Sequence, residues 1–155
     1  MKKTPEEIAA TAHSLAESIL RALGFDFSLE VSQTEAGEIQ LMISGADASY
    51  IIGENGSRLD DLQYLLNRLI VLGSDEAPRV RVDCNHYRER SEAKIIQNAR
   101  KKAERVLASG KPFALPPMNA YHRRLVHSAL AEIPGIKTES EDVDSRFKRI
   151  TISRA

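Results

Sequence analysis

Arg123 and His127 are four residues apart in the run Tyr121-His122-Arg123-Arg124-Leu125-Val126-His127. If this run is helical, the spacing places both side chains on one face, where they can act on the same ligand. An arginine offers a planar fork of donors to a phosphate, and a histidine can donate a hydrogen bond to an oxygen or stack on a base. The alternative is a half-buried histidine bonded to nearby backbone, beside a solvated arginine.

Gly53 and Gly56 form a second motif, Gly-x-x-Gly, between two predicted helices. Two residues without Cβ let the chain turn sharply and let another backbone approach closely. Amides at the start of the following helix carry partial positive charge, so a phosphate is a natural occupant. On this interpretation Ile51, Ile52 and Leu59 line an apolar groove for unstacked bases, whereas the alternative is a plain turn.

Glu54 and Asn55 occupy the two positions between these glycines, where a carboxylate lowers affinity for phosphate. Arg58, one turn into the next helix, is placed to offset that charge. We therefore expect either weak nucleic-acid binding at this loop or its use in a protein contact.

Catalysis finds little support in the sequence. His13, His86, His122 and His127 do not combine with carboxylates at a metal-ligand spacing, and the single cysteine, Cys84, cannot build a thiolate site alone. No phosphate-binding Walker loop or serine elbow occurs, and Arg123 and His127 lack a second general base. We expect no enzymatic activity, no metal and no cofactor.

The charge of the chain is unevenly distributed although it sums to zero. Residues 1–84 carry 7 Lys and Arg and 14 Asp and Glu, whereas residues 85–155 carry 15 and 8. The basic half suits a polyanion partner, and two oppositely charged modules that dock on each other would give the same totals. The apolar stretches are too short to span a bilayer and no leader opens the chain, so we expect a cytoplasmic protein.

The first half is predicted to contain three helices and three strands. Thr4, Pro5 and Glu7 predict a capped helix over 5–23. Runs 25–31 and 39–43 predict a hairpin, and Asp47 is a plausible N-cap for a short helix over 48–52. A helix from Ser57 to Leu72 and Gly73 and an alternating strand over 79–84 follow.

The second half is predicted to begin with a long basic helix over 86–109. Its inward residues are Ile96, Ala99, Ala103 and Val106, and its basic stripe is Arg90, Lys94, Lys101 and Arg105. A short strand over 113–115, a helix over 118–132 and two strands over 136–140 and 147–153 complete the chain.

The glycine loop and the order of the elements around it resemble a type II KH domain. The run 117–127, with Thr138-Glu139-Ser140 and the last strand, looks like the small domain named for its Arg, three residues, His signature. With Asp83 to Arg90 between them, the two parts resemble the bacterial Jag family, SpoIIIJ-associated and also called KhpB. The resemblance covers about residues 5–153.

This resemblance implies an α+β fold with two domains. Residues 1–85 would form the type II KH domain, a three-stranded sheet with helices on one face, and 86–155 a small α/β domain, joined through the helix 86–109. Such domains clamp single-stranded nucleic acid. The implied contacts are Ile52, Gly53, Glu54, Asn55, Gly56, Ser57, Arg58, Arg90, Lys94, Tyr121, Arg123, Arg124 and His127.

The resemblance further implies an RNA-binding protein that acts after transcription, in bacterial cell elongation, division or envelope maintenance. Single-stranded DNA, a small KH-only protein and a second copy of the chain are further candidate partners, and no membrane insertion is expected. Many members carry an additional N-terminal Jag domain that this sequence is expected to lack. The alternative function is a protein-interaction adaptor, a KH-mediated dimer or a partner in membrane-protein biogenesis, with incidental nucleic-acid binding.

Overall fold

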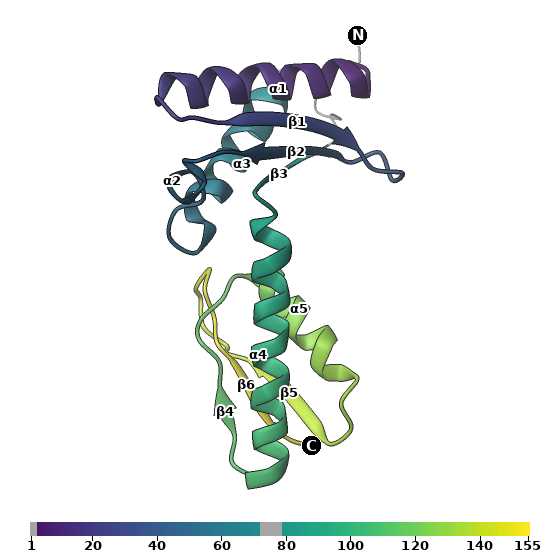
Figure 1. The fold of residues 1–155 in the computed structure, drawn as a ribbon. Coiled ribbons are helices and arrows are strands. Elements are labelled where there is room, and N and C mark those ends of the chain that lie inside the picture. Colours follow the sequence, from purple (N-terminus) through teal and green to yellow (C-terminus); the bar gives the residue numbers. More distant parts are fainter. Residues whose placement is uncertain (1–2, 72–78) are drawn as a thin grey trace. The chain divides into compact units, whose positions relative to one another are not determined.

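A computed structural model describes residues 3–71 and 79–155 of the chain, which forms two compact units, Met1–Arg88 and Glu89–Ala155. Both units mix helices with a three-stranded sheet, so the expected α+β class is confirmed (Figure 1). Within residues 3–71 and 79–155, no helix combines the length and apolarity needed to cross a membrane.

The first unit contains the elements in the expected order. They are α1 (Pro5–Ala22), β1 (Ser28–Gln33), β2 (Ile39–Ser44), α2 (Ala48–Ile52), the 3-10 turn η1 (Glu54–Gly56), α3 (Ser57–Val71) and β3 (Val80–Cys84). Strand β2 lies in the middle of the sheet, antiparallel to β1 and parallel to β3. The end of α3 expected at Leu72 and Gly73 lies outside the described residues.

Local capping explains where α1 begins. The Thr4 hydroxyl accepts a hydrogen bond from the Glu7 amide, and the Glu7 carboxylate accepts one from the Thr4 amide at 2.8 Å, which confirms the predicted capping box. Asp47 does precede α2, but its side chain makes no cap hydrogen bond to that helix. Its carboxylate instead accepts from the Asp26 amide at 2.7 Å, so it fixes the chain that enters β1.

One apolar core holds the first unit together. Helices α1 and α3 and the buried side of the sheet contribute to it, because alternate residues of β2 and β3 point to the same face. The largest fully buried side chains there are Ile8, Leu20, Ile39, Leu41, Ile43, Leu59, Leu66 and Ile70.

Side chains satisfy the outer edge of β3, which would otherwise expose unpaired amides and carbonyls. Asn67 accepts from the Val80 amide at 2.9 Å and donates to the Val80 carbonyl at 2.8 Å. Gln63 accepts from the Val82 amide at 2.9 Å, and Arg88 donates to the Val82 carbonyl at 2.7 Å. The same arginine pairs with Asp60, so it links β3 to α3.

The second unit contains α4 (Tyr87–Ser109, which begins two residues before the unit), β4 (Phe113–Ala114), α5 (Ala120–Ala131), β5 (Ile136–Ser140) and β6 (Ile150–Arg154). Strand β6 lies between β4 and β5 and is antiparallel to both. Its core consists of Ala99, Ala103, Val106, Leu115, Val126, Leu130, Ile150 and Ile152.

Two details of this unit differ from expectation. Ile95, rather than Ile96, packs against the core, because residues 95, 99, 103 and 106 keep the helical phase. The last strand begins at Ile150 and not at Phe147, since Lys148 makes only an isolated bridge with Met118.

Candidate functional site

Helix α5 has a well-defined start. Asn119 has an extended backbone, and its side-chain oxygen accepts from the His122 amide at 2.8 Å, which caps the helix. Val126 and Leu130 then point into the core. Arg123 and His127 lie on this helix four residues apart and are both half-buried, as expected for neighbouring positions on one face.

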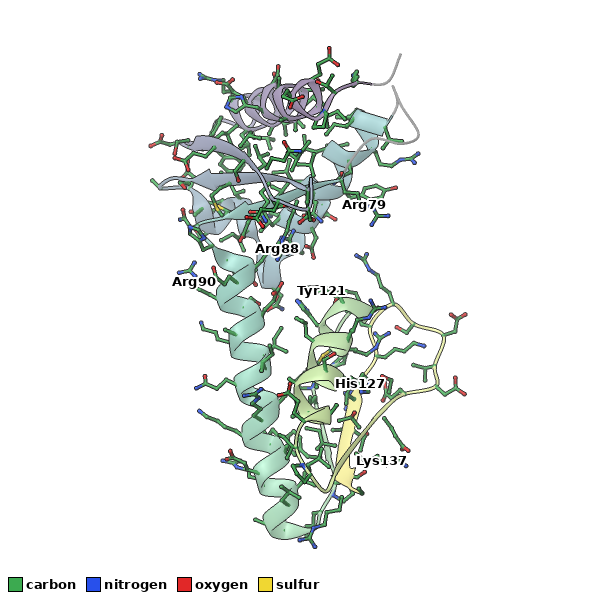
Figure 2. The ribbon with its side chains drawn as sticks, turned by 90° about the vertical axis from the view of Figure 1, so that its right-hand side faces the viewer. Arg79, Arg88, Arg90, Tyr121, His127 and Lys137 are labelled. Carbon is green, nitrogen blue, oxygen red and sulfur yellow. The ribbon has the colours of Figure 1, made fainter. Side chains whose placement is uncertain are left out.

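His127 is held by two hydroxyl groups of β5. Its Nδ1 lies 2.6 Å from Thr138 Oγ1, and its Nε2 lies 3.0 Å from Ser140 Oγ. In Figure 2 the His127 side chain projects from α5 on the side of β5, the strand that carries Lys137. A hydroxyl can donate or accept, so the two contacts fix the ring in either tautomer. The histidine is therefore bonded to side chains and not to the backbone that the alternative interpretation assumed.

Arg123 is anchored to the segment that precedes α5. Its Nη1 donates to the Met118 carbonyl at 2.9 Å. The same carbonyl accepts from the Lys148 amide at 3.1 Å, so one oxygen joins the arginine to the residues before β6. A guanidinium has five N–H donors, and this bond uses one of them. Arg123 is thus positioned by the fold and keeps donors for an anion.

The remaining residues expected here lie around this pair or on α4. Arg124 is exposed, and Tyr121, about half-exposed, donates from its hydroxyl to Glu92 at 3.1 Å. Arg90 projects from α4 on the side away from α5 (Figure 2). Lys94, one turn further along α4, is exposed on the same face as Arg90. The structure therefore brings Tyr121 and Arg123 together on α5 but places the α4 basic pair on a different surface.

The glycine loop is shaped by contacts within the first unit. Gly53 has φ +72°, and a Cβ there would lie 2.7 Å from Arg58 Cγ. Gly56 has φ +78°, and a Cβ there would lie 2.8 Å from Tyr87 Cε1. Asn55, between them, is also left-handed with φ +51°. The glycines are thus required by neighbouring side chains whether or not a ligand binds.

The polar residues of the loop are accessible. Glu54, Asn55, Ser57 and Arg58 are exposed, and Ile52 is half-buried. Arg58 Nη1 donates to the Tyr50 carbonyl at 2.9 Å, so the guanidinium lies against the end of α2. Its positive charge is close to the loop, as expected, but it is tied to the backbone.

The expected apolar groove beside the loop is wrong in two of its three residues. Ile51 and Leu59 are buried in the core with 3% and 0% exposure, so they cannot contact a base. Their helical spacing reports packing of α2 and α3, and only Ile52 remains partly accessible.

Sequence reasoning did not identify Thr138 and Ser140 as partners of His127. The signal was available, because alternate residues of a strand share a face and the run 136–140 was predicted to be a strand. Which helix that face contacts depends on tertiary packing and has no local signature. Among the described parts of the chain, no group of three or more His, Cys, Asp or Glu residues could hold a metal ion.

Known proteins resemble this chain over most of its length. The family model for the domain named after its Arg, three residues, His signature matches residues 93–154, which include Arg123 and His127. A Clostridium symbiosum protein named RNA-binding protein KhpB is 32% identical over 153 residues, covering 97% of this chain and 68% of that protein.

Two further relatives bear the same name. The Lactiplantibacillus plantarum protein is 30% identical over 155 residues and the Bacillus subtilis protein 29% identical over 93 residues. The matches cover 92% and 60% of this chain but only 47% and 45% of those relatives, so the chain spans about half of their length.

Proposed function

Because the chain belongs to the KhpB family, we propose that it binds single-stranded RNA and that Arg123 and His127 form the centre of the contact in the second unit. The observation that carries this proposal is the placement of the two side chains. Arg123 is anchored through one donor to the Met118 carbonyl, and His127 is fixed by Thr138 and Ser140.

The roles of the two residues follow from their partners. Arg123 keeps donors that can bind a phosphate oxygen, and a guanidinium does so with good geometry. Both ring nitrogens of His127 are engaged by hydroxyls. His127 therefore acts by presenting its ring to the RNA and by fixing the two hydroxyls, rather than through an unengaged N–H. Tyr121 and Arg124 border the pair on the same helix.

We further propose that residues 1–85 are a type II KH domain and that its glycine loop contacts the RNA backbone. The order helix, strand, strand, helix, glycine loop, helix, strand supports this assignment, as does the parallel pairing of β2 with β3. Such a loop clamps about four nucleotides. In this proposal Ile52 to Arg58 form the loop contact, and residues 86–155 form the second nucleic-acid-binding domain.

The proposed cellular role is regulation of RNA after transcription in the bacterial cytoplasm. By family resemblance, the processes affected are cell elongation, division and envelope maintenance, with a small KH-only protein or a second copy of the chain as partner. Arg90 and Lys94 would extend the basic surface along α4, because each cation that neutralises a phosphate releases counterions.

The test is binding of a labelled single-stranded RNA by fluorescence anisotropy across a salt series. Removing one phosphate contact with Arg123→Ala should lower affinity and flatten the salt slope by about 0.7 to 1. Arg21→Ala is the matched control, because it removes one positive charge from α1, where Arg21 pairs with Glu17. Both variants are compared below their melting temperatures, since Arg123→Ala also loses the bond to Met118.

Two outcomes would contradict the proposal. If the native chain binds no single strand at low salt, the adaptor function is favoured. If Arg123→Ala and Arg21→Ala give the same slope as the native chain, Arg123 does not contact a phosphate.

A further inference from the structure

Phe147 is a large apolar side chain that the fold leaves in solvent. It is 53% exposed and lies between β5 and β6, outside the core of the second unit. Its neighbour Arg146 lies over the ring, with the guanidinium carbon 5.6 Å from the centroid. An arginine over an aromatic ring leaves the opposite face for another flat group, and unpaired bases stack on such faces.

Backbone hydrogen bonds connect this ring to Arg123. Lys148, the residue after Phe147, exchanges two hydrogen bonds with Met118, at 2.9 and 3.1 Å. The Met118 carbonyl that accepts from Lys148 also accepts from Arg123. The positions of Phe147 and the Arg123 guanidinium are therefore set by one shared carbonyl, although the residues are 24 positions apart in the sequence.

The local charge argues that the contribution of Phe147 is stacking rather than attraction of phosphates. Residues 141–149 carry three acidic side chains (Glu141, Asp142, Asp144) and three basic ones (Arg146, Lys148, Arg149), so the segment is formally neutral. Glu141 accepts from the Arg149 amide at 3.0 Å, which keeps one carboxylate beside the basic residues. A neutral segment adds little to the salt dependence of binding.

We propose that Phe147 is a stacking platform for an unpaired RNA base, next to the phosphate bound by Arg123. This inference rests on the proposed RNA binding and adds a residue and a mode of contact to it. Arg146 covers one face of the ring and the base occupies the other. Because every base has a flat face, the platform is tolerant of sequence and favours the larger purines.

The test compares Phe147→Leu with the matched variant Phe113→Leu. Phe113 is also a partly exposed phenylalanine with a cation over its ring, Lys102 at 4.4 Å, but it lies on β4 opposite Ile152. Affinity for labelled oligoadenylate and oligouridylate is measured across a salt series. Phe147→Leu should weaken oligoadenylate binding by roughly 5- to 100-fold, with a smaller effect on oligouridylate and an unchanged salt slope. Phe113→Leu should leave both affinities unchanged.

Phe147→Trp provides a second readout, because the chain contains no tryptophan. Stacking of a base on the new indole should quench its fluorescence on addition of oligoadenylate, and Phe113→Trp should show no such change.

The outcomes separate this inference from the function on which it rests. If Arg123→Ala weakens binding while Phe147→Leu behaves like Phe113→Leu, the platform is refuted and the RNA contact stands. If Phe147→Leu flattens the salt slope as Arg123→Ala does, its effect is not stacking and the platform is again refuted. A native chain that binds neither oligonucleotide overturns both proposals.

Discussion

Replacing Gly56 by alanine tests what fixes the shape of the glycine loop. The new methyl group would lie 2.8 Å from Tyr87 Cε1, closer than carbon atoms pack in proteins. Tyr87 begins α4 and is packed against the core of the first unit, so its ring cannot simply move away. The residue would also keep φ near +78°, which alanine adopts at a cost.

The size of the effect follows from these two contributions. The left-handed backbone costs about 1 to 2 kcal/mol for a residue with a Cβ. Forcing a methyl group against a packed ring costs about 1 to 3 kcal/mol more. Gly37→Ala isolates the first contribution, because Gly37 has φ +83° and nothing lies within 4 Å of its added Cβ. We expect Gly56→Ala to lower the free energy of unfolding by about 2 to 5 kcal/mol and Gly37→Ala by about 1 to 2 kcal/mol.

The assay is urea unfolding followed by circular dichroism, with Tyr87→Ala as the second arm of a double-mutant cycle. Gly37, Gly56 and Tyr87 all lie in the first unit, so the same cooperative transition reports each change. Once Tyr87→Ala has removed the ring, Gly56→Ala should cost no more than Gly37→Ala costs in the native background. Equal costs for Gly56→Ala with and without the ring would refute the explanation.

Two further predictions concern charge in the same unit. Glu54→Lys should strengthen RNA binding several-fold and steepen the salt slope by about 0.7 if the loop meets a phosphate, whereas Glu35→Lys, in the β1–β2 turn, should not; Asn55 is kept because its φ of +51° suits asparagine better than lysine, and equal slopes for the two variants would place the loop off the RNA. Burial, with a smaller effect of Asp83, raises the pKa of the Cys84 thiol from 9.0 to about 11, so the folded state holds this proton more tightly than the unfolded chain. The resulting stability is complete below about pH 9 and lost as the pH rises through 11; the free energy of unfolding of the native chain minus that of Cys84→Val should therefore fall by roughly 2 to 3 kcal/mol across this range, and a constant difference would contradict the assignment.

Local signals in the sequence predicted the helices and strands well, because their causes lie within a few residues. Thr4, Pro5 and Glu7 form the capping box of α1 without help from the rest of the fold. The alternation in the run 79–84 likewise appears as buried Val80, Val82 and Cys84 in β3. Where the phase of a pattern was ambiguous, as for Ile95 and Ile96, only packing against the core selected the inward residue.

The contacts that shape the candidate sites were not predictable in the same way. His127 meets hydroxyls 11 and 13 residues away, and Arg123 is anchored by a carbonyl that β6 has to bring into place through Lys148. Phe147 was expected inside a strand, where its exposure would have been ordinary. The structure places it outside β6, and its neighbour's bridge to Met118 makes its position relevant to Arg123.

The two motifs therefore carry unequal weight as indications of function. Gly53 and Gly56 each have a reason for their identity inside the fold, the close approach of Arg58 and of Tyr87, so a Gly-x-x-Gly loop would be required here without any ligand. No comparable packing reason explains Arg123 and His127, because an apolar pair would bury the same face of α5 without two hydroxyls and a backbone carbonyl to orient it. A half-buried cation held in place by one of its five donors is costly to position, and an anion that binds the remaining donors gives the arrangement its reason. The case for RNA binding thus depends mainly on the second unit, and the glycine loop gains weight only if Glu54→Lys changes the salt slope.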